Sequence, residues 1–219
     1  GVGQVNDMEW SIDGQSIIIG ATSGIFVYSS FDQTLELFID PGFLPVEIAI
    51  SPDGRNIAAG SIDGKVMTWD LQTGEFIREY IFSKPDSERV IDVHSRITGI
   101  SYSPNGMSIA IGYDNGVINY FSADKNGPSV VLEQIPSVQD IAVSADGRFL
   151  YVANGEKDIL VWDIATKKIV SRFSNPTPIN KFILSSDRLL MLGGGSAYSV
   201  YLWDLSLERT VASFPYLES

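Results

Sequence analysis

Residues 51 to 70 read SPDGRNIAAGSIDGKVMTWD, and both ends of this stretch return along the chain. The serine phrase at its start recurs at steps of 40, 52, 41 and 41 residues, and the five copies begin at Ser11, Ser51, Ser103, Ser144 and Ser185. An aromatic residue lies 15 residues past the fourth position of the phrase in the last four copies and 14 in the first. A period near forty residues with this content predicts a repeat propeller, in which each unit is one four-stranded blade.

The second unit shows why each copy folds as a blade. Short apolar segments at 45–50, 56–60 and 65–70 are separated by Ser-x-Asp-Gly turns, and a more polar segment at 75–80 follows Thr73-Gly74. Asp accepts hydrogen bonds from its own turn and Gly takes a positive φ, so each phrase reverses the chain between two strands. One such meander cannot bury both of its faces, so the copies must stack on one another.

We therefore predict an all-β protein with one domain over residues 1–219. The domain is a β-propeller of four-stranded antiparallel blades, and the five blades are expected at about 5–40, 45–81, 96–133, 137–174 and 177–215. The blades either close into a five-bladed ring or form an arc of a larger propeller, and we favour the arc. An arc leaves the apolar outer faces of its first and last blades to be covered by missing sequence, a larger assembly or a homo-oligomer.

The units resemble those of the WD-repeat (WD40-like) β-propeller family over residues 5 to about 214. The resemblance is carried by the serine-to-glycine turns and by the dipeptides Trp69-Asp70, Trp162-Asp163 and Trp203-Asp204, with Tyr28-Ser29 and Phe121-Ser122 as degenerate forms. The Gly-His pair of the family is absent from every unit, so we expect these blades to depend on apolar packing, with the repeated tryptophans in the core. The resemblance implies a non-enzymatic scaffold for protein–protein interaction.

The composition argues against several other classes of protein. The chain has no cysteine and a single histidine, His94, which cannot supply a His/Cys metal set, so we expect no metal, no cofactor and no catalytic residue. The net charge of −12 and the scattered basic residues disfavour binding to nucleic acid or to an anionic membrane. Neither a membrane span nor a signal peptide is visible, so a soluble protein is expected, with the cytoplasm slightly favoured.

An insertion interrupts the period between the second and third units. The step of 52 residues places about 11 extra residues in the segment 81–95. It contains a charged turn and the only histidine, and its candidate partner-binding residues are Lys84, Asp86, Glu88, Arg89 and His94. The segment is either a loop that contacts a partner or a tolerated surface insertion, because lengthening a loop costs little entropy.

One aligned position at the start of each inner strand is mostly charged. It holds Asp7, Glu47, Gly99, Asp140 and Lys181, which should ring one mouth of the central channel. The charges form either a solvated rim that contributes little to folding or a negative site for a lysine or arginine side chain of a basic partner. Together with the insertion, these residues define the predicted binding face.

Two other functions compete with a scaffold. A five-bladed lectin-like propeller would bind a carbohydrate or another small ligand between blades, although the aromatic residues Phe43, Tyr113 and Tyr198, which we expect to be exposed, do not share one position in the repeat. The third reading is a sensor or regulatory part of a larger multidomain protein, or a propeller hydrolase that uses the channel acids.

Overall fold

The computed structural model describes residues 1–80, 95–124, 130–132, 135–195 and 199–215. Within them the chain forms five four-stranded sheets. The first three blades are β1 (Val5–Trp10), β2 (Ser16–Ala21), β3 (Gly24–Ser29) and β4 (Leu35–Ile39); β5 (Pro45–Ile50), β6 (Asn56–Ser61), β7 (Val66–Asp70) and β8 (Phe76–Tyr80); and β9 (Ile97–Tyr102), β10 (Ser108–Tyr113), β11 (Ile118–Ser122) and β12 (Val130–Leu132). The last two are β13 (Asp140–Val143), β14 (Phe149–Ala153), β15 (Asp158–Asp163) and β16 (Lys168–Ser174); and β17 (Lys181–Leu184), β18 (Leu190–Gly194), β19 (Ser199–Asp204) and β20 (Arg209–Pro215).

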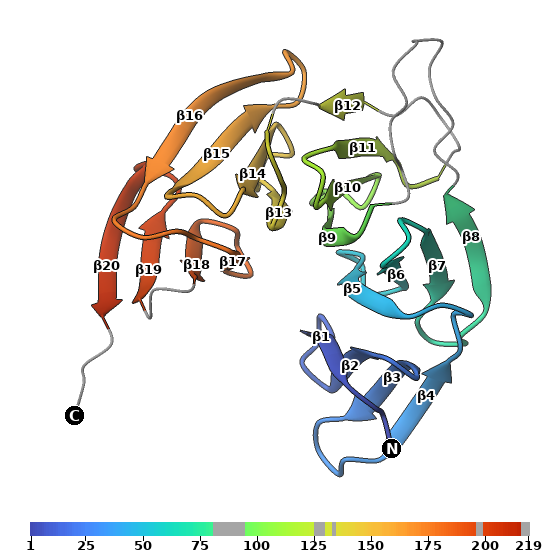
Figure 1. The fold of residues 1–219 in the computed structure, drawn as a ribbon. Coiled ribbons are helices and arrows are strands. Elements are labelled where there is room, and N and C mark those ends of the chain that lie inside the picture. The colour runs from blue at the N-terminus through green and yellow to red at the C-terminus, as the bar shows by residue number, and fades with distance from the viewer. Residues whose placement is uncertain (81–94, 125–129, 133–134, 196–198, 216–219) are drawn as a thin grey trace.

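Every blade is an antiparallel meander in which strands that follow one another in sequence pair. Figure 1 shows the blades around a common centre, with the first strand of each blade nearest the centre and the fourth at the periphery. The predicted all-β propeller with five blades is confirmed.

The serine phrase makes the turn between the first and second strands of each blade. In blade two, Ser51 Oγ donates to Asp53 Oδ1 at 2.5 Å and accepts from the backbone N–H of Asn56 at 2.9 Å. Gly54 follows with a φ of 72°. The same pair of side-chain bonds is present in the other four copies, with Asn105 in place of Asp in the third.

Apolar residues from successive blades form four buried clusters, one for each pair of neighbouring blades. The cluster between blades one and two joins Ile18 and Ile25 to Ile48, Ile57 and Trp69. Among the described residues, no fifth cluster of this kind joins blade five to blade one. The inner strands likewise contact in the series β1, β5, β9, β13, β17, and Figure 1 shows blades one and five at the two ends of an arc.

Candidate functional site

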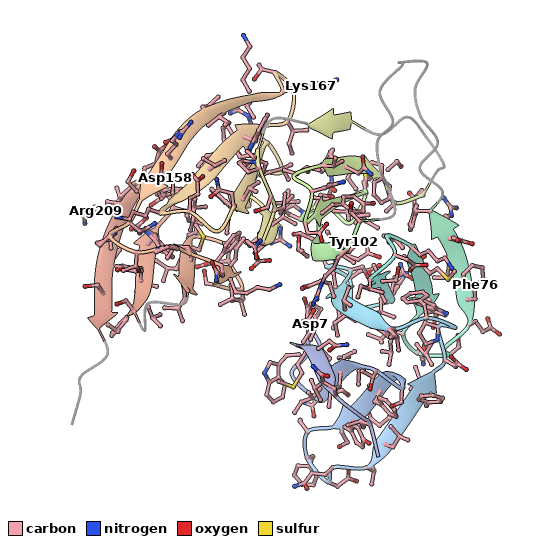
Figure 2. All side chains as sticks on the ribbon, viewed as in Figure 1. Asp7, Phe76, Tyr102, Asp158, Lys167 and Arg209 are labelled. Atoms are coloured by element: carbon pink, nitrogen blue, oxygen red, sulfur yellow. The ribbon has the colours of Figure 1, made fainter. Side chains whose placement is uncertain are left out.

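The mostly charged position of the repeat lies on the inner strand of each blade. The residue at this position pairs with a small residue of the second strand. The pairs are Asp7 with Gly20, Glu47 with Gly60, Gly99 with Gly112, Asp140 with Ala153, and Lys181 with Gly194. The repeat therefore brings these five residues to the same level of the inner strands, one per blade. We call this level the channel mouth. Figure 2 shows Asp7 where the first and second blades meet, whereas Phe76 lies at the periphery.

The carboxylate of Asp7 joins the first two blades. Its Oδ1 accepts from the N–H of Met8 at 2.8 Å, and its Oδ2 accepts from the N–H of Ile48, on the inner strand of blade two, at 2.8 Å. An inner strand has a free edge toward the channel, so these backbone donors would otherwise lack a protein partner. Asp7 thus acts as a clip between neighbouring inner strands.

Asp140 repeats this arrangement between blades four and five. Its Oδ1 accepts from the N–H of Ile141 at 2.9 Å, and its Oδ2 accepts from the N–H of Phe182 at 2.8 Å. Asp140 is also buried. At Asp7 and Asp140 the alternative of a simply solvated rim is therefore corrected, because both carboxylates bind backbone donors of the next blade.

Lys181 reaches across the channel mouth to three other blades. Its Nζ lies 2.7 Å from Glu47 Oε1 on blade two, donates to the carbonyl of Thr98 on blade three at 3.0 Å, and lies 3.9 Å from Asp140 Oδ1 on blade four. The side chain of Lys181 is 57% exposed, whereas that of Glu47 is 13% exposed. The ammonium group of Lys181, which faces solvent, thus lies close to two carboxylates that are mostly buried.

Burial sets the ionisation of these acids. It raises the pKa of Glu47 to about 8 and that of Asp140 to about 6, and the positive charge of Lys181 opposes both shifts. The pKa of Asp7 is also raised, mainly by burial. For Lys181, burial acts to lower the pKa, but the charges of Asp140 and Glu47 outweigh it and the pKa is raised. The channel mouth therefore becomes more negative as the pH rises through neutrality.

A second cation of blade five, Arg188, lies beyond the C-terminal end of β17, whereas Lys181 begins that strand. Arg188 Nη1 donates to the carbonyl of Val143 at 2.7 Å and to that of Tyr102 at 3.2 Å. Burial raises the pKa of nearby Glu9 to about 8, while the N–H of Ile50 and the charge of Arg188 act against this rise. Blade five thus contributes a cation near each end of its inner strand, and both bind groups of other blades.

Comparison with known proteins agrees with this architecture. The family model for the WD domain, G-beta repeat, matches residues 45–70 and 86–122. Protein LST8 homolog of Drosophila melanogaster is 26% identical over 165 residues, which are 71% of this chain and 50% of that protein. The WD repeat-containing protein 26 homolog of Arabidopsis thaliana is 21% identical over 214 residues, 94% of this chain and 34% of that protein.

The resemblance to the WD-repeat β-propeller family is confirmed. Eukaryotic translation initiation factor 3 subunit I of Danio rerio is a further relative, 25% identical over 208 residues, 74% of this chain and 64% of that protein. The chain spans between about a third and two thirds of the length of these three relatives.

The WD dipeptides have two separate structural roles. Trp69, Trp162 and Trp203 are buried, as predicted. The aspartates that follow them accept backbone N–H groups of the turn before the fourth strand: Asp70 from Gln72 and Thr73, Asp163 from Thr166, and Asp204 from Ser206 and Leu207. These six residues therefore have structural roles within the blades.

The remaining candidates divide into residues that the structure describes and residues that it does not. Lys84, Asp86, Glu88, Arg89 and His94 lie outside the described residues, and so does Tyr198. Tyr113, expected to be exposed, is buried in the core between blades two and three. Phe43 is partly buried against Trp69, with ring centroids 6.2 Å apart. Phe43 and Tyr113 therefore do not form a repeated exposed platform for a sugar.

Sequence reasoning missed Glu9 and Arg188. Arg188 had a visible signal, because it takes the place that glycine occupies in the other four serine phrases, yet nothing in the sequence indicated that its guanidinium reaches two other blades. In the described ranges there is no group of three or more His, Cys, Asp or Glu suited to a metal ion. The same ranges contain no helix that is long and apolar enough to cross a membrane.

Proposed function

We propose that the chain is a non-enzymatic WD-repeat scaffold that binds protein partners. One of its relatives is, by name, a subunit of a translation initiation factor, which supports a role within an assembly. The described side chains near the channel are consistent with the same proposal, since the acids bind backbone N–H groups or Lys181. An arc of packed sheets that presents loops and strand ends is well suited to holding partners.

We assign partner binding to the channel mouth, and we propose that the partner is basic. The observation that carries this assignment is the geometry of Lys181, an exposed cation 2.7 Å from Glu47 and 3.9 Å from Asp140. A lysine or arginine of a partner would compete with Lys181 for the same carboxylates, and the net charge of −12 would steer a basic partner toward the chain.

The insertion is the second part of the proposed binding face. Its last residue, Ser95, lies two positions before β9. The carbonyl of Thr98 on that strand accepts a hydrogen bond from Lys181. The end of the insertion therefore leads directly to the channel mouth. The role of residues 81–94 in partner contact stays a prediction from the sequence.

A fluorescently labelled octalysine peptide tests the assignment. Its side chains stay charged up to pH 8.5, whereas Glu47 and Asp140 become ionised between pH 6 and pH 8.5, so its affinity should rise roughly threefold or more over this range. Fluorescence anisotropy at fixed ionic strength measures this change. In Glu47→Gln the rise should be reduced, and in the control Glu75→Gln, at an exposed acid before β8, it should be retained.

Two results would count against this binding face. One is a peptide affinity that is independent of pH. The other is an equal loss of affinity in Glu47→Gln and Glu75→Gln, which would indicate attraction by the overall negative charge without any contribution from the channel mouth.

A further inference from the structure

The oxygens around Lys181 Nζ form a site for one ammonium group. Glu47 Oε1 lies 2.7 Å from this nitrogen, the carbonyl oxygen of Thr98 lies 3.0 Å from it, and Asp140 Oδ1 lies 3.9 Å from it. These oxygens belong to the inner strands of blades two, three and four. Because strands hold their side chains and carbonyls more precisely than loops do, the packing of the blades fixes this site.

Two of these oxygens are held by bonds in which Lys181 takes no part. The carboxylate of Asp140 accepts backbone N–H groups with both of its oxygens. Thr98 donates its hydroxyl to the carbonyl of Val138 at 2.8 Å, which ties β9 to the segment that leads into blade four. The oxygens of Asp140 and Thr98 should therefore keep their positions when a different ammonium group takes the place of Nζ.

The arrangement suits a primary ammonium better than a guanidinium. An ammonium group is a compact charge with three N–H donors, which can reach oxygens on different sides of it. A guanidinium is planar and binds a carboxylate best through two parallel N–H groups, one to each oxygen. Asp140 cannot offer such a pair of free oxygens, because its Oδ2 already accepts from the N–H of Phe182 at 2.8 Å. A lysine side chain therefore matches the site more closely than an arginine side chain does.

We propose that the channel mouth receives the lysine side chain of a partner, and that Lys181 occupies the ammonium position until that side chain displaces it. This receptor role rests on the proposed function above, and it adds the identity of the inserted side chain and a limit that the chain itself sets on binding. A tethered ammonium competes as if it were present at high local concentration, so the partner must displace it. The charges of Asp140, Glu47 and Asp7 favour whichever ammonium occupies the site.

An added alkylammonium ion tests the site without any protein partner. Propylammonium has the atoms that the side chain of Lys181→Ala lacks, whereas tetramethylammonium has the same charge but no N–H donor. At about pH 9 the primary amine is still protonated and ionised carboxylates are favoured, so about 50 mM propylammonium chloride should raise the Tm of Lys181→Ala by about 2 °C more than tetramethylammonium chloride does. Lys181 is the exposed first residue of β17, so we expect the variant to fold, and Lys181→Ser should give the same result.

Lys65→Ala is the matched control for this measurement. Lys65 Nζ lies 3.5 Å from Asp63 Oδ2, and the two side chains are 50% and 51% exposed. The control variant loses the same charge and also leaves a carboxylate without its lysine, but that carboxylate faces water. In Lys65→Ala and in the unaltered chain, the two salts should change the Tm equally to within about 0.5 °C.

Labelled peptides test the preference for lysine. Fluorescence anisotropy at fixed ionic strength compares octalysine with octaarginine. Loss of either lysine should strengthen the binding of both peptides slightly, because the chain becomes more negative. Lys181→Ala should in addition bind octalysine about fivefold more tightly than Lys65→Ala does, since the peptide no longer competes with a tethered ammonium. Octaarginine should bind the two variants with equal affinity to within about twofold.

The results separate the lysine site from the proposed function. An equal response of Lys181→Ala to the two salts, or equal gains in affinity for the two peptides, would overturn the lysine site, while octalysine binding that depends on pH and on Glu47 would still support the channel mouth as the binding face. A selective response to propylammonium without a gain for octalysine would show that a partner's lysine does not use the site. Octalysine binding that depends on neither pH nor Glu47 would overturn both proposals.

Discussion

Two equivalent tryptophans differ in the surroundings of their indole nitrogens. The Nε1 of Trp203 donates to Asn175 Oδ1 at 3.1 Å, and the amide of Asn175 in turn donates to the carbonyls of Lys157 and Phe173. The Nε1 of Trp162 is buried and has no partner among the described residues. A buried donor without a partner already lowers the stability of the folded protein, so removing it leaves no new unpaired group. Removing a donor that has a partner leaves the acceptor buried and unpaired.

This difference predicts unequal costs for the same substitution. Trp203→Phe should lower the free energy of unfolding by about 1–3 kcal/mol more than Trp162→Phe, because it leaves Asn175 Oδ1 buried without a donor. Both variants lose similar apolar area, so each is the control for the other. Urea unfolding followed by circular dichroism measures the two costs. Equal costs, or a larger cost for Trp162→Phe, would contradict the role given to Asn175.

At the scale of a single element, the turn between β17 and β18 combines local strain with a long-range contact. Arg188 has a φ of 57°, close to the values of 70–72° at the four glycines that occupy its place in the other blades. A residue with a side chain is disfavoured in this region of backbone space. The turn keeps Arg188 there while its guanidinium binds the carbonyls of Tyr102 and Val143, which end the inner strands of blades three and four.

Two substitutions separate the strain from the contact. Arg188→Ala keeps the strain and loses the bonds, so it should lower the free energy of unfolding by about 1.5–3 kcal/mol. Arg188→Gly loses the same bonds but relieves the strain, so it should be more stable than Arg188→Ala by about 1 kcal/mol. Thermal and urea unfolding check both values. Arg55→Ala, at the exposed position after Gly54, is the control and should change stability by less than about 0.5 kcal/mol.

At the scale of the whole molecule, the sequence repeat was sufficient to predict most of the fold. The serine phrases and aromatic positions predicted the number of blades, and the alignment of the copies was sufficient to place Asp7, Glu47, Asp140 and Lys181 at one level. What the acids bind could not be read from the alignment, because it depends on how closely successive inner strands approach. The burial of Tyr113 was missed for a similar reason, since its neighbours come from a different blade.

The pH dependence of stability follows from two opposed groups of carboxyls. Turn aspartates such as Asp53 and Asp187 have lowered pKa values, mainly because serine hydroxyls and backbone N–H groups bind their charged forms. Their contribution is present above the unfolded pKa and is lost as the pH falls below about 4. Glu9 and Glu47 have pKa values raised by burial to about 8. For these two, the folded state holds its protons more tightly than the unfolded state does.

The contribution of Glu9 and Glu47 is therefore complete below about pH 4.5 and is lost as the pH rises to about 8. We expect the Tm to increase by a few degrees when the pH is lowered from 8.5 to 5.5, and to decrease again below about pH 4. Scanning calorimetry at constant ionic strength measures this curve. In the double variant Glu9→Gln, Glu47→Gln the increase between pH 8.5 and 5.5 should be smaller, because the amides do not titrate, while the fall below pH 4 should persist. A Tm that instead rises toward pH 8.5 would mean that the ion pair of Glu47 with Lys181 outweighs the burial of the carboxyl groups.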